Sequence, residues 1–133
     1  MIEINQLLFW GMFGLCCEIV FTAAMNLVSK KTYNFIGHTS LWMFPVYSVG
    51  LTYGFILVQY TIPNDFIRFL SYPLWIWLVE ILIGYPLSKV GIRAWDYRYL
   101  SDNKHWEGII SFVHFPVWIF FGLLVELVNA LLK

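Results

Sequence analysis

Four long apolar stretches, over residues 7–28, 39–60, 66–88 and 108–131, make up most of this chain of 133 residues. At about 1.5 Å of rise per helical residue, each stretch is long enough to cross roughly 30 Å of hydrocarbon. Only 12% of the residues are charged, whereas soluble domains carry about 25%. The sequence therefore predicts one all-α integral membrane domain over residues 1–133, with four transmembrane helices in two hairpins.

The charges predict how such a domain would lie in a membrane. Eight basic and eight acidic side chains cancel, so nothing attracts nucleic acid, and membrane lipids are the expected partners. Lysine and arginine gather in the loops 29–38 and 89–107, which the positive-inside rule places in the cytoplasm. We expect a multi-pass protein of the cell (inner) membrane with both termini outside. Glu3 and the length of the first apolar stretch argue against a cleavable signal peptide.

Two carboxyl groups lie deep inside the predicted spans. Glu18 precedes Lys30 by twelve residues, about 18 Å of helix, and Glu80 precedes Lys89 by nine, about 13 Å. A carboxyl at such depth costs several kcal/mol unless it is protonated, paired or turned to a polar cavity. His114, about 9 Å into the last span from the same side, is expected at a similar level. The three groups could meet as a site or, structurally, as neutral bonding partners between helices.

Small and polar residues recur at helical spacing in each span, which marks the face turned to protein. These inward faces give a predicted set of ligand-lining residues: Glu18, Glu80, His114, Trp42, Tyr47, Trp77 and Trp118. The segments Ser40–Tyr47 and Ser111–Trp118 also resemble each other, which suggests a parallel internal repeat, although apolar sequences often resemble one another by composition.

The loop 89–107 is rich in aromatic and basic residues. One interpretation is a set of interfacial anchors that meet lipid headgroups. The other is a cap folded over the cytoplasmic mouth of the bundle, formed by Arg93, Trp95, Asp96 and Tyr97.

No cofactor is expected, and a metal site is not favoured. Glu18, Glu80 and His114 could be drawn around a metal, but no pair has the i, i+3 or i, i+4 spacing of helical metal ligands. The adjacent Cys16 and Cys17 suit neither an unstrained disulfide nor a metal and are read as small core residues. Nothing resembles a Walker motif, so any ATP hydrolysis would need a separate ATPase subunit.

The chain resembles the transmembrane protein 229 family and the bacterial membrane proteins grouped as ABC-transporter type IV (CmpB-like). The resemblance rests on motifs in the same order along most of the chain: Glu18 followed by Phe21-Thr22-Ala23-Ala24, Gly37-His38-Thr39-Ser40-Leu41-Trp42 leading to Phe44 and Tyr47, Gly50, Trp77 to Glu80 with Gly84, and Trp95-Asp96-Tyr97. It implies a four-helix integral membrane fold.

Three functions remain open on the sequence. The favoured one is a binding or transport module for a small amphiphilic or cationic ligand held against Glu18 and Glu80. The second is an intramembrane acid/base enzyme acting on a lipid or isoprenoid, with a glutamate as proton donor. The third is a non-catalytic membrane subunit whose polar groups only specify helix pairing. A non-enzymatic role is favoured, and a homo-oligomer is expected because four helices leave little room for a solute path.

Overall fold

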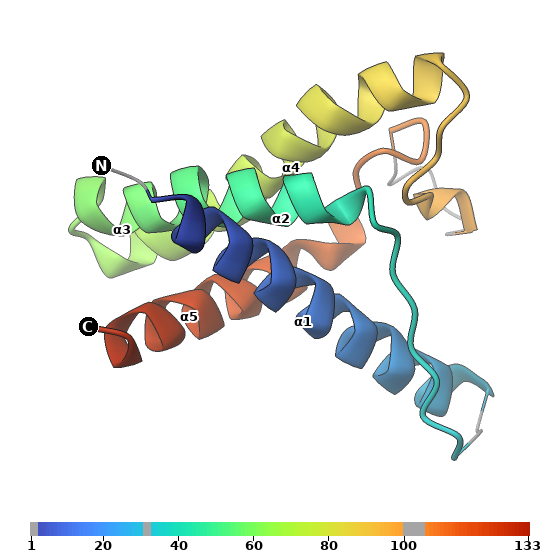
Figure 1. Ribbon diagram of the computed structural model, residues 1–133, viewed down its shortest axis with the longest axis horizontal. Helices are drawn as coiled ribbons and strands as arrows, with labels where there is room; N and C mark the ends of the chain where they lie inside the picture. The colour runs from blue at the N-terminus through green and yellow to red at the C-terminus, as the bar shows by residue number, and fades with distance from the viewer. Residues whose placement is uncertain (1–2, 31–32, 100–105) are drawn as a thin grey trace.

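The described part of the chain forms helical rods joined by loops (Figure 1). The computed structural model describes residues 3–30, 33–99 and 106–133, and the bounds below refer to that part. The helices are α1 (Ile4–Lys30), α2 (Met43–Val49), a π-helical stretch (Gly50–Phe55), α3 (Ile56–Thr61), α4 (Asp65–Lys89) and α5 (Phe115–Leu131). The expectation of a helical protein is therefore confirmed.

Three of these rods are long and apolar enough to cross a membrane by length and composition. They are Ile4–Lys30, Asp65–Lys89 and Phe112–Leu131, the last beginning with a short 3₁₀ turn over Phe112–His114. The second predicted span is helical over Met43–Thr61 but is interrupted by the π-helical stretch, and it is not among the three.

Two helices begin later than the sequence predicted. Residues 39–42 and 108–111 belong to the preceding loops, so helix starts at Met43 rather than Thr39 and at Phe112 rather than Gly108. Pro45 and Pro116 then fall in the first turns of α2 and α5. A proline there leaves no intrahelical bond unmade, since the first four N–H groups have no partner in the helix anyway. Both prolines thus start helices instead of bending them.

Close contact between α1 and α2 depends on two glycines. Gly11 lies under the Phe44 ring and Gly14 under Tyr47, and a methyl group at Gly11 would come within 2.6 Å of Phe44. Ser48 of α2 also donates a hydrogen bond to the Leu7 carbonyl (2.8 Å). The backbones can approach because these positions carry no side chain.

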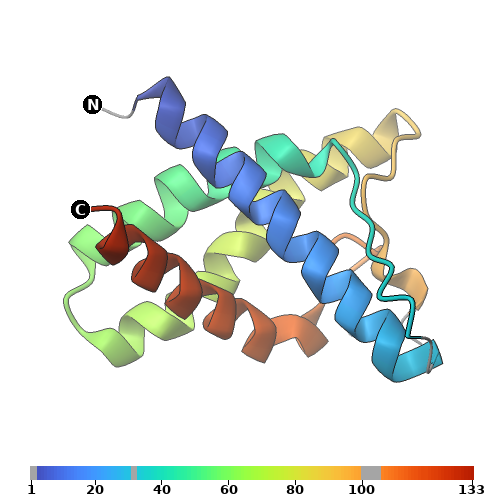
Figure 2. The same cartoon turned by 60° about the horizontal axis from the view of Figure 1, so that its bottom comes forward.

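The other end of α1 is lined by extended chain rather than by a helix. The segment 33–42 returns alongside α1, as Figure 2 shows. The Thr22 hydroxyl bonds to both the amide and the carbonyl of His38 (2.8 and 3.0 Å), and Asn26 donates to the Ile36 carbonyl (2.9 Å). Polar side chains in the second half of α1 therefore hold the segment 33–42 against that helix.

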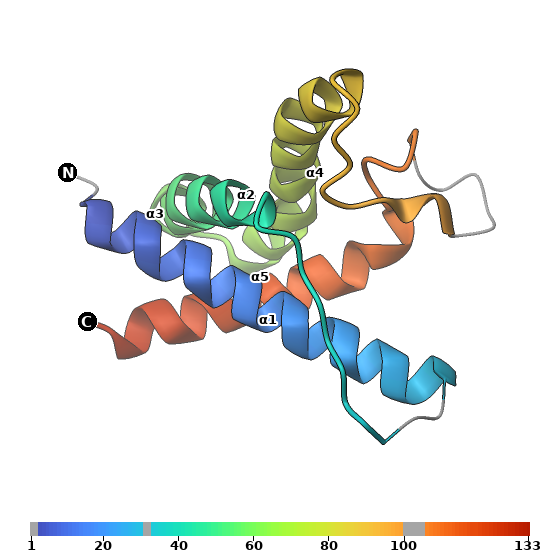
Figure 3. The same ribbon diagram turned by 45° about the vertical axis from the view of Figure 1, so that its right-hand side comes forward.

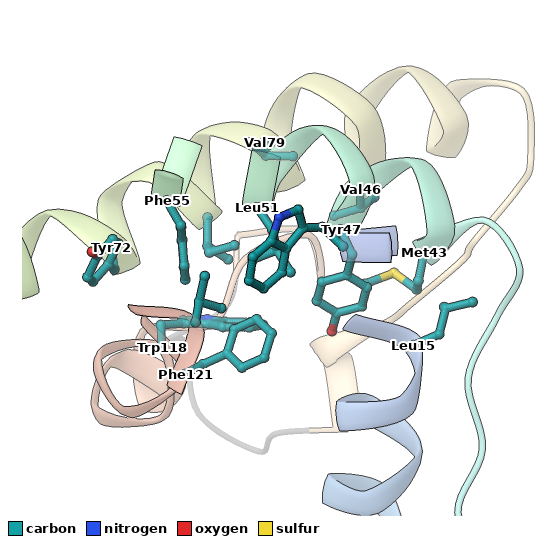
Figure 4. Close-up of a cluster of buried hydrophobic side chains, with 13 residues drawn as sticks. Leu15, Met43, Val46, Tyr47, Leu51, Phe55, Tyr72, Val79, Trp118 and Phe121 are labelled. Atoms are coloured by element: carbon teal, nitrogen blue, oxygen red, sulfur yellow. The ribbon is translucent and has the colours of Figure 1, made fainter. Parts of the chain in front are cut away.

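The π-helical stretch lies against α4 at the centre of the molecule (Figures 3 and 4). The Trp75 indole donates to the Gly50 carbonyl (3.0 Å), and its ring occupies the space over Gly54. Phe55 packs against Tyr72 of α4, with ring centroids 4.4 Å apart, and both are fully buried. The Trp75 hydrogen bond therefore joins α4 to the start of the π-helical stretch.

Candidate functional site

The described part of the loop after α4 folds back onto the end of that helix. The Trp95 indole packs over Gly84, where a methyl group would lie 2.6 Å from the ring, and donates to the Ile109 carbonyl (2.8 Å). The Tyr97 amide bonds to the carbonyl of Gly108 (3.0 Å), and Arg93 donates to the Glu107 carbonyl (3.0 Å). We call residues 93–98 the cap segment.

Tyr97 carries the cap segment into the interior. Its hydroxyl donates to Oε1 of Glu80 at 2.7 Å, and Glu80 is only 1% exposed. Burial, with the nearby Glu80 carboxyl, raises the pKa of Tyr97 well above its usual range. Tyr97 therefore keeps its proton and can act as a donor to Glu80.

Glu18 approaches the same region from α1. Its carboxyl lies beside the hydroxyls of Tyr47 and Thr39, and Figure 4 shows the Tyr47 ring directed from α2 toward α1. A negative charge on Glu18 would act on Glu80. Charges on the two glutamates would also act on the hydroxyls of Tyr47 and Tyr97. We call the surroundings of Glu18, Tyr47, Glu80 and Tyr97 the polar centre; that the two carboxyls share one pocket stays a prediction.

His114 lies at the edge of this centre, at the start of α5 rather than one or two turns inside it. Its ring is 5.4 Å from the Tyr97 ring and 6.0 Å from Phe21, between centroids. Its Nδ1 is 2.8 Å from the hydroxyl of Ser111, which is fully buried. His114 thus contacts Tyr97, which bonds to Glu80; that Glu18, Glu80 and His114 meet in one site and bind a ligand stays a prediction.

Besides Nε2 of Gln59, several polar atoms in the interior are buried but have no hydrogen-bond partner among the described residues. They are Oε2 of Glu18 and of Glu80, the hydroxyls of Thr39 and Thr52, and the indole N–H groups of Trp77 and Trp118. An unpartnered buried polar group costs about 1–3 kcal/mol. The set holds both donors and acceptors, which is what a polar guest would need.

The remaining predicted residues are placed as follows. Trp77 packs against Phe112 (4.9 Å) and Trp118 against Phe121 (6.1 Å), between ring centroids. Trp42 lies in the turn before α2 and is 48% exposed, so it is peripheral to the carboxyls. Asp96 turns away from the centre to Arg98, whose guanidinium holds the pKa of that carboxyl below its usual range.

A second polar cluster, which the sequence analysis did not predict, lies between α4 and α5. Arg68 donates from Nε and Nη2 to the two oxygens of Glu126 (2.6 and 3.2 Å), and Tyr72 also donates to this carboxyl. The sequence did contain a signal for this cluster. Arg68 is the one lysine or arginine in the apolar stretch 66–88, and Glu126 falls on the polar face of the last predicted span. What the sequence could not give was their pairing across 58 positions.

Among the described residues, the carboxyl, histidine and cysteine side chains do not gather as metal ligands usually do. Within residues 3–30, 33–99 and 106–133, no group of three or more His, Cys, Asp or Glu could hold a metal ion. The chemistry that the arrangement offers is proton exchange and the binding of a positive or hydrogen-bonding group.

Replacing Tyr97 with phenylalanine is expected to lower the free energy of unfolding by about 1–3 kcal/mol, since Glu80 would lose its donor while remaining buried. The measurement is unfolding by a denaturing detergent, followed by circular dichroism. Tyr33→Phe is the matched control, because Tyr33 is 92% exposed and the same hydroxyl is removed there. Equal effects of the two substitutions would contradict the role of this bond.

No family model matches the chain, and no solved structure matches it.

Proposed function

We propose that this chain is a membrane-embedded binding or transport module for a small cationic or amphiphilic ligand, which Glu18 and Glu80 hold between the helices. The observation that carries the proposal is the pair of buried carboxylate oxygens without a partner in the described structure, Oε2 of each glutamate. A cation or an ammonium group bound next to these oxygens would supply the hydrogen bonds or the positive charge that they lack.

The cap segment supports the same proposal. Tyr97 reaches Glu80 from a loop, not from a helix of the bundle, and Trp95 is held by one hydrogen bond and its packing on Gly84. A ligand bound to Oε2 of Glu80 would lie beside the Tyr97 hydroxyl, which is bonded to Oε1. Access to the carboxyl would then depend on release of the cap, which needs no rearrangement of α1, α4 or α5.

The membrane setting is part of the proposal. The three long apolar helices support a multi-pass protein, and the lysines and arginines near the ends of α1 and α4 favour a cytoplasmic location for the cap. We extend the proposal to a homo-oligomer, to relatedness with the transmembrane protein 229 and ABC-transporter type IV families, and to a separate ATPase subunit if transport is driven by ATP.

Tetraphenylphosphonium, a lipophilic cation, is a suitable probe for the proposed site. The purified protein is expected to bind it saturably in equilibrium dialysis, and the variant with Glu18→Gln and Glu80→Gln is expected to bind at least about tenfold more weakly. Glutamine keeps the size of each side chain and one acceptor oxygen, but its NH2 group replaces the other oxygen and it cannot carry charge. Glu107→Gln, an exposed carboxyl beside the cap, is the control and should bind as the unaltered protein does.

The result has three other readable outcomes. Undiminished binding by the double variant, or none by the unaltered protein, would overturn the cationic ligand. A double variant that no longer elutes as one folded species would favour a purely structural role for the glutamates.

An acid/base enzyme is the second candidate, and the contact between Tyr97 and Glu80 favours it. Two proton-bearing groups 2.7 Å apart, with His114 against the tyrosine ring, are suited to proton transfer to a lipid or isoprenoid. A lipid species whose amount changes on overexpression of the unaltered protein, but not of the double variant, would favour the enzyme over the binding module.

A further inference from the structure

A hollow of about 270 Å³ lies between the ends of α3 and α5 and the first turn of α4, away from the cap segment. Figure 1 shows these ends, together with the C-terminus, on the side of the molecule opposite the cap. The hollow has room for several water molecules or one small polar headgroup, since a water takes up about 30 Å³ in the liquid. Its lining residues are Gln59, Tyr60, Arg68, Glu126, Asn129, Ala130 and Lys133.

The N–H groups of Arg68, which lines this hollow, are all engaged in hydrogen bonds within the described structure. Nε and Nη2 of Arg68 are bonded to Glu126, Nη2 also reaches Asp65 (2.7 Å), and Nη1 donates to the carbonyls of Ile62 and Pro63 (3.0 and 3.5 Å). Arg68 and Glu126 therefore neutralise each other. A ligand must be recognised by other groups.

Gln59 supplies the first such group. Its Oε1 accepts a hydrogen bond from Asn129 (2.7 Å), which fixes the orientation of the amide. Its Nε2 is buried and finds no acceptor in the described part of the chain. A donor held in place at the wall of a hollow, with nothing to donate to, points to an acceptor supplied from outside.

Lys133 supplies the second group. Its ammonium lies 4.7 Å from the centre of the Tyr60 ring, and Tyr60, 64% exposed, forms the rim of the hollow. Of the two basic side chains that line the hollow, Arg68 is already bonded to Glu126 and Asp65, so Lys133 is the one that could meet an anionic ligand. The hollow thus offers an amide donor and an ammonium group.

We propose that the hollow binds a phosphate group, and that in the membrane this is the phosphate of a phospholipid headgroup. Phosphate oxygens accept from the Gln59 amide and the Lys133 ammonium, and charge-assisted bonds of this kind are about twice as strong as neutral ones. The lipid source rests on the proposed membrane setting, since the ends of spanning helices lie at the headgroup level, where tyrosine is enriched. The site is independent of Glu18 and Glu80.

Native mass spectrometry of the purified protein tests this with two lipids, phosphatidylglycerol and a monoglucosyl diacylglycerol that has no phosphate. The unaltered protein is expected to retain phosphatidylglycerol at least about tenfold more strongly than the glucolipid. The variant with Gln59→Glu and Lys133→Gln keeps the acceptor for Asn129 but loses the amide donor of Gln59 and the charge of Lys133, so it should lose that preference. Lys30→Gln is the matched control, because it removes the same charge at the end of α1.

Equal retention of both lipids, or an unchanged preference in the double variant, would overturn the phosphate site. If the double variant fails to fold, Lys133→Gln alone replaces it, because Lys133 is exposed. This variant should also lose the preference for phosphatidylglycerol. A separate arm with inorganic phosphate distinguishes the source: binding of phosphate ions with no preference for the phospholipid would overturn the lipid. The variant with both Glu18 and Glu80 changed should keep the preference, so loss of tetraphenylphosphonium binding and loss of this site are separate results.

Discussion

Replacing Glu126 with leucine is expected to lower the free energy of unfolding by about 3–5 kcal/mol, the range for removing one partner of a buried ion pair. The side chains of Arg68 and Glu126 are only 12% and 22% exposed, and their two hydrogen bonds join α4 to α5. In the variant, Arg68 would keep the carbonyls of Ile62 and Pro63 and, as a charged partner, only Asp65, which is 74% exposed and a weak partner. The guanidinium, 12% exposed, would lose its nearest counter-charge.

The double variant with Arg68→Met and Glu126→Leu separates the ion pair from simple packing. Since two apolar side chains of similar size leave no charge behind, most of the loss should be recovered. The measurement is a double-mutant cycle of unfolding in mild detergent, completed by Arg68→Met alone. A double variant as unstable as Glu126→Leu would show that the charges do not carry the effect.

Replacing Gly14 with alanine is expected to destabilise the protein by about 1–3 kcal/mol, because the new methyl group would overlap the base of the Tyr47 side chain. The overlapping atoms include Cβ and Cγ of Tyr47, which cannot swing aside, so α1 and α2 must move apart. Tyr47 would then leave its place beside Glu18, so binding of tetraphenylphosphonium should weaken as well.

Gly50→Ala is the matched control. A methyl group there would lie 3.6 Å or more from Val79 and Ile76, which is ordinary contact. Alanine is also the better helix former by about 0.5–1 kcal/mol, so this variant should be neutral or slightly stabilised. Thermal unfolding in mild detergent measures both, and an equal loss of stability in the two variants would contradict the packing argument.

Part of the candidate site could be anticipated from spacing alone. Glu18 and Glu80 each lie several helical turns before a basic loop, and in the structure both are on long helices with Oε2 buried. Helical periodicity could give this because it fixes both the face and the height of a residue in an uninterrupted helix. α1 and α4 are such helices, of 27 and 25 residues.

Other features could not be found in this way. The π-helical stretch, the late start at Met43 and the return of residues 33–42 along α1 depend on contacts with Trp75, Thr22 and Asn26. Apolar periodicity cannot detect them, because a wide turn and an ordinary turn have the same composition. The pairing of Arg68 with Glu126 likewise joins residues that share no local pattern.

The sequence by itself determined that this chain forms long apolar helices with acidic groups on particular faces, because helix length and amphipathic periodicity are local properties. Only the tertiary structure decided which loop residue reaches Glu80, which carbonyls accept side-chain donors and which end of the bundle contains a hollow. Those outcomes follow from the angles at which helices pack and from the course of the loops, which depend on contacts between residues far apart in the chain.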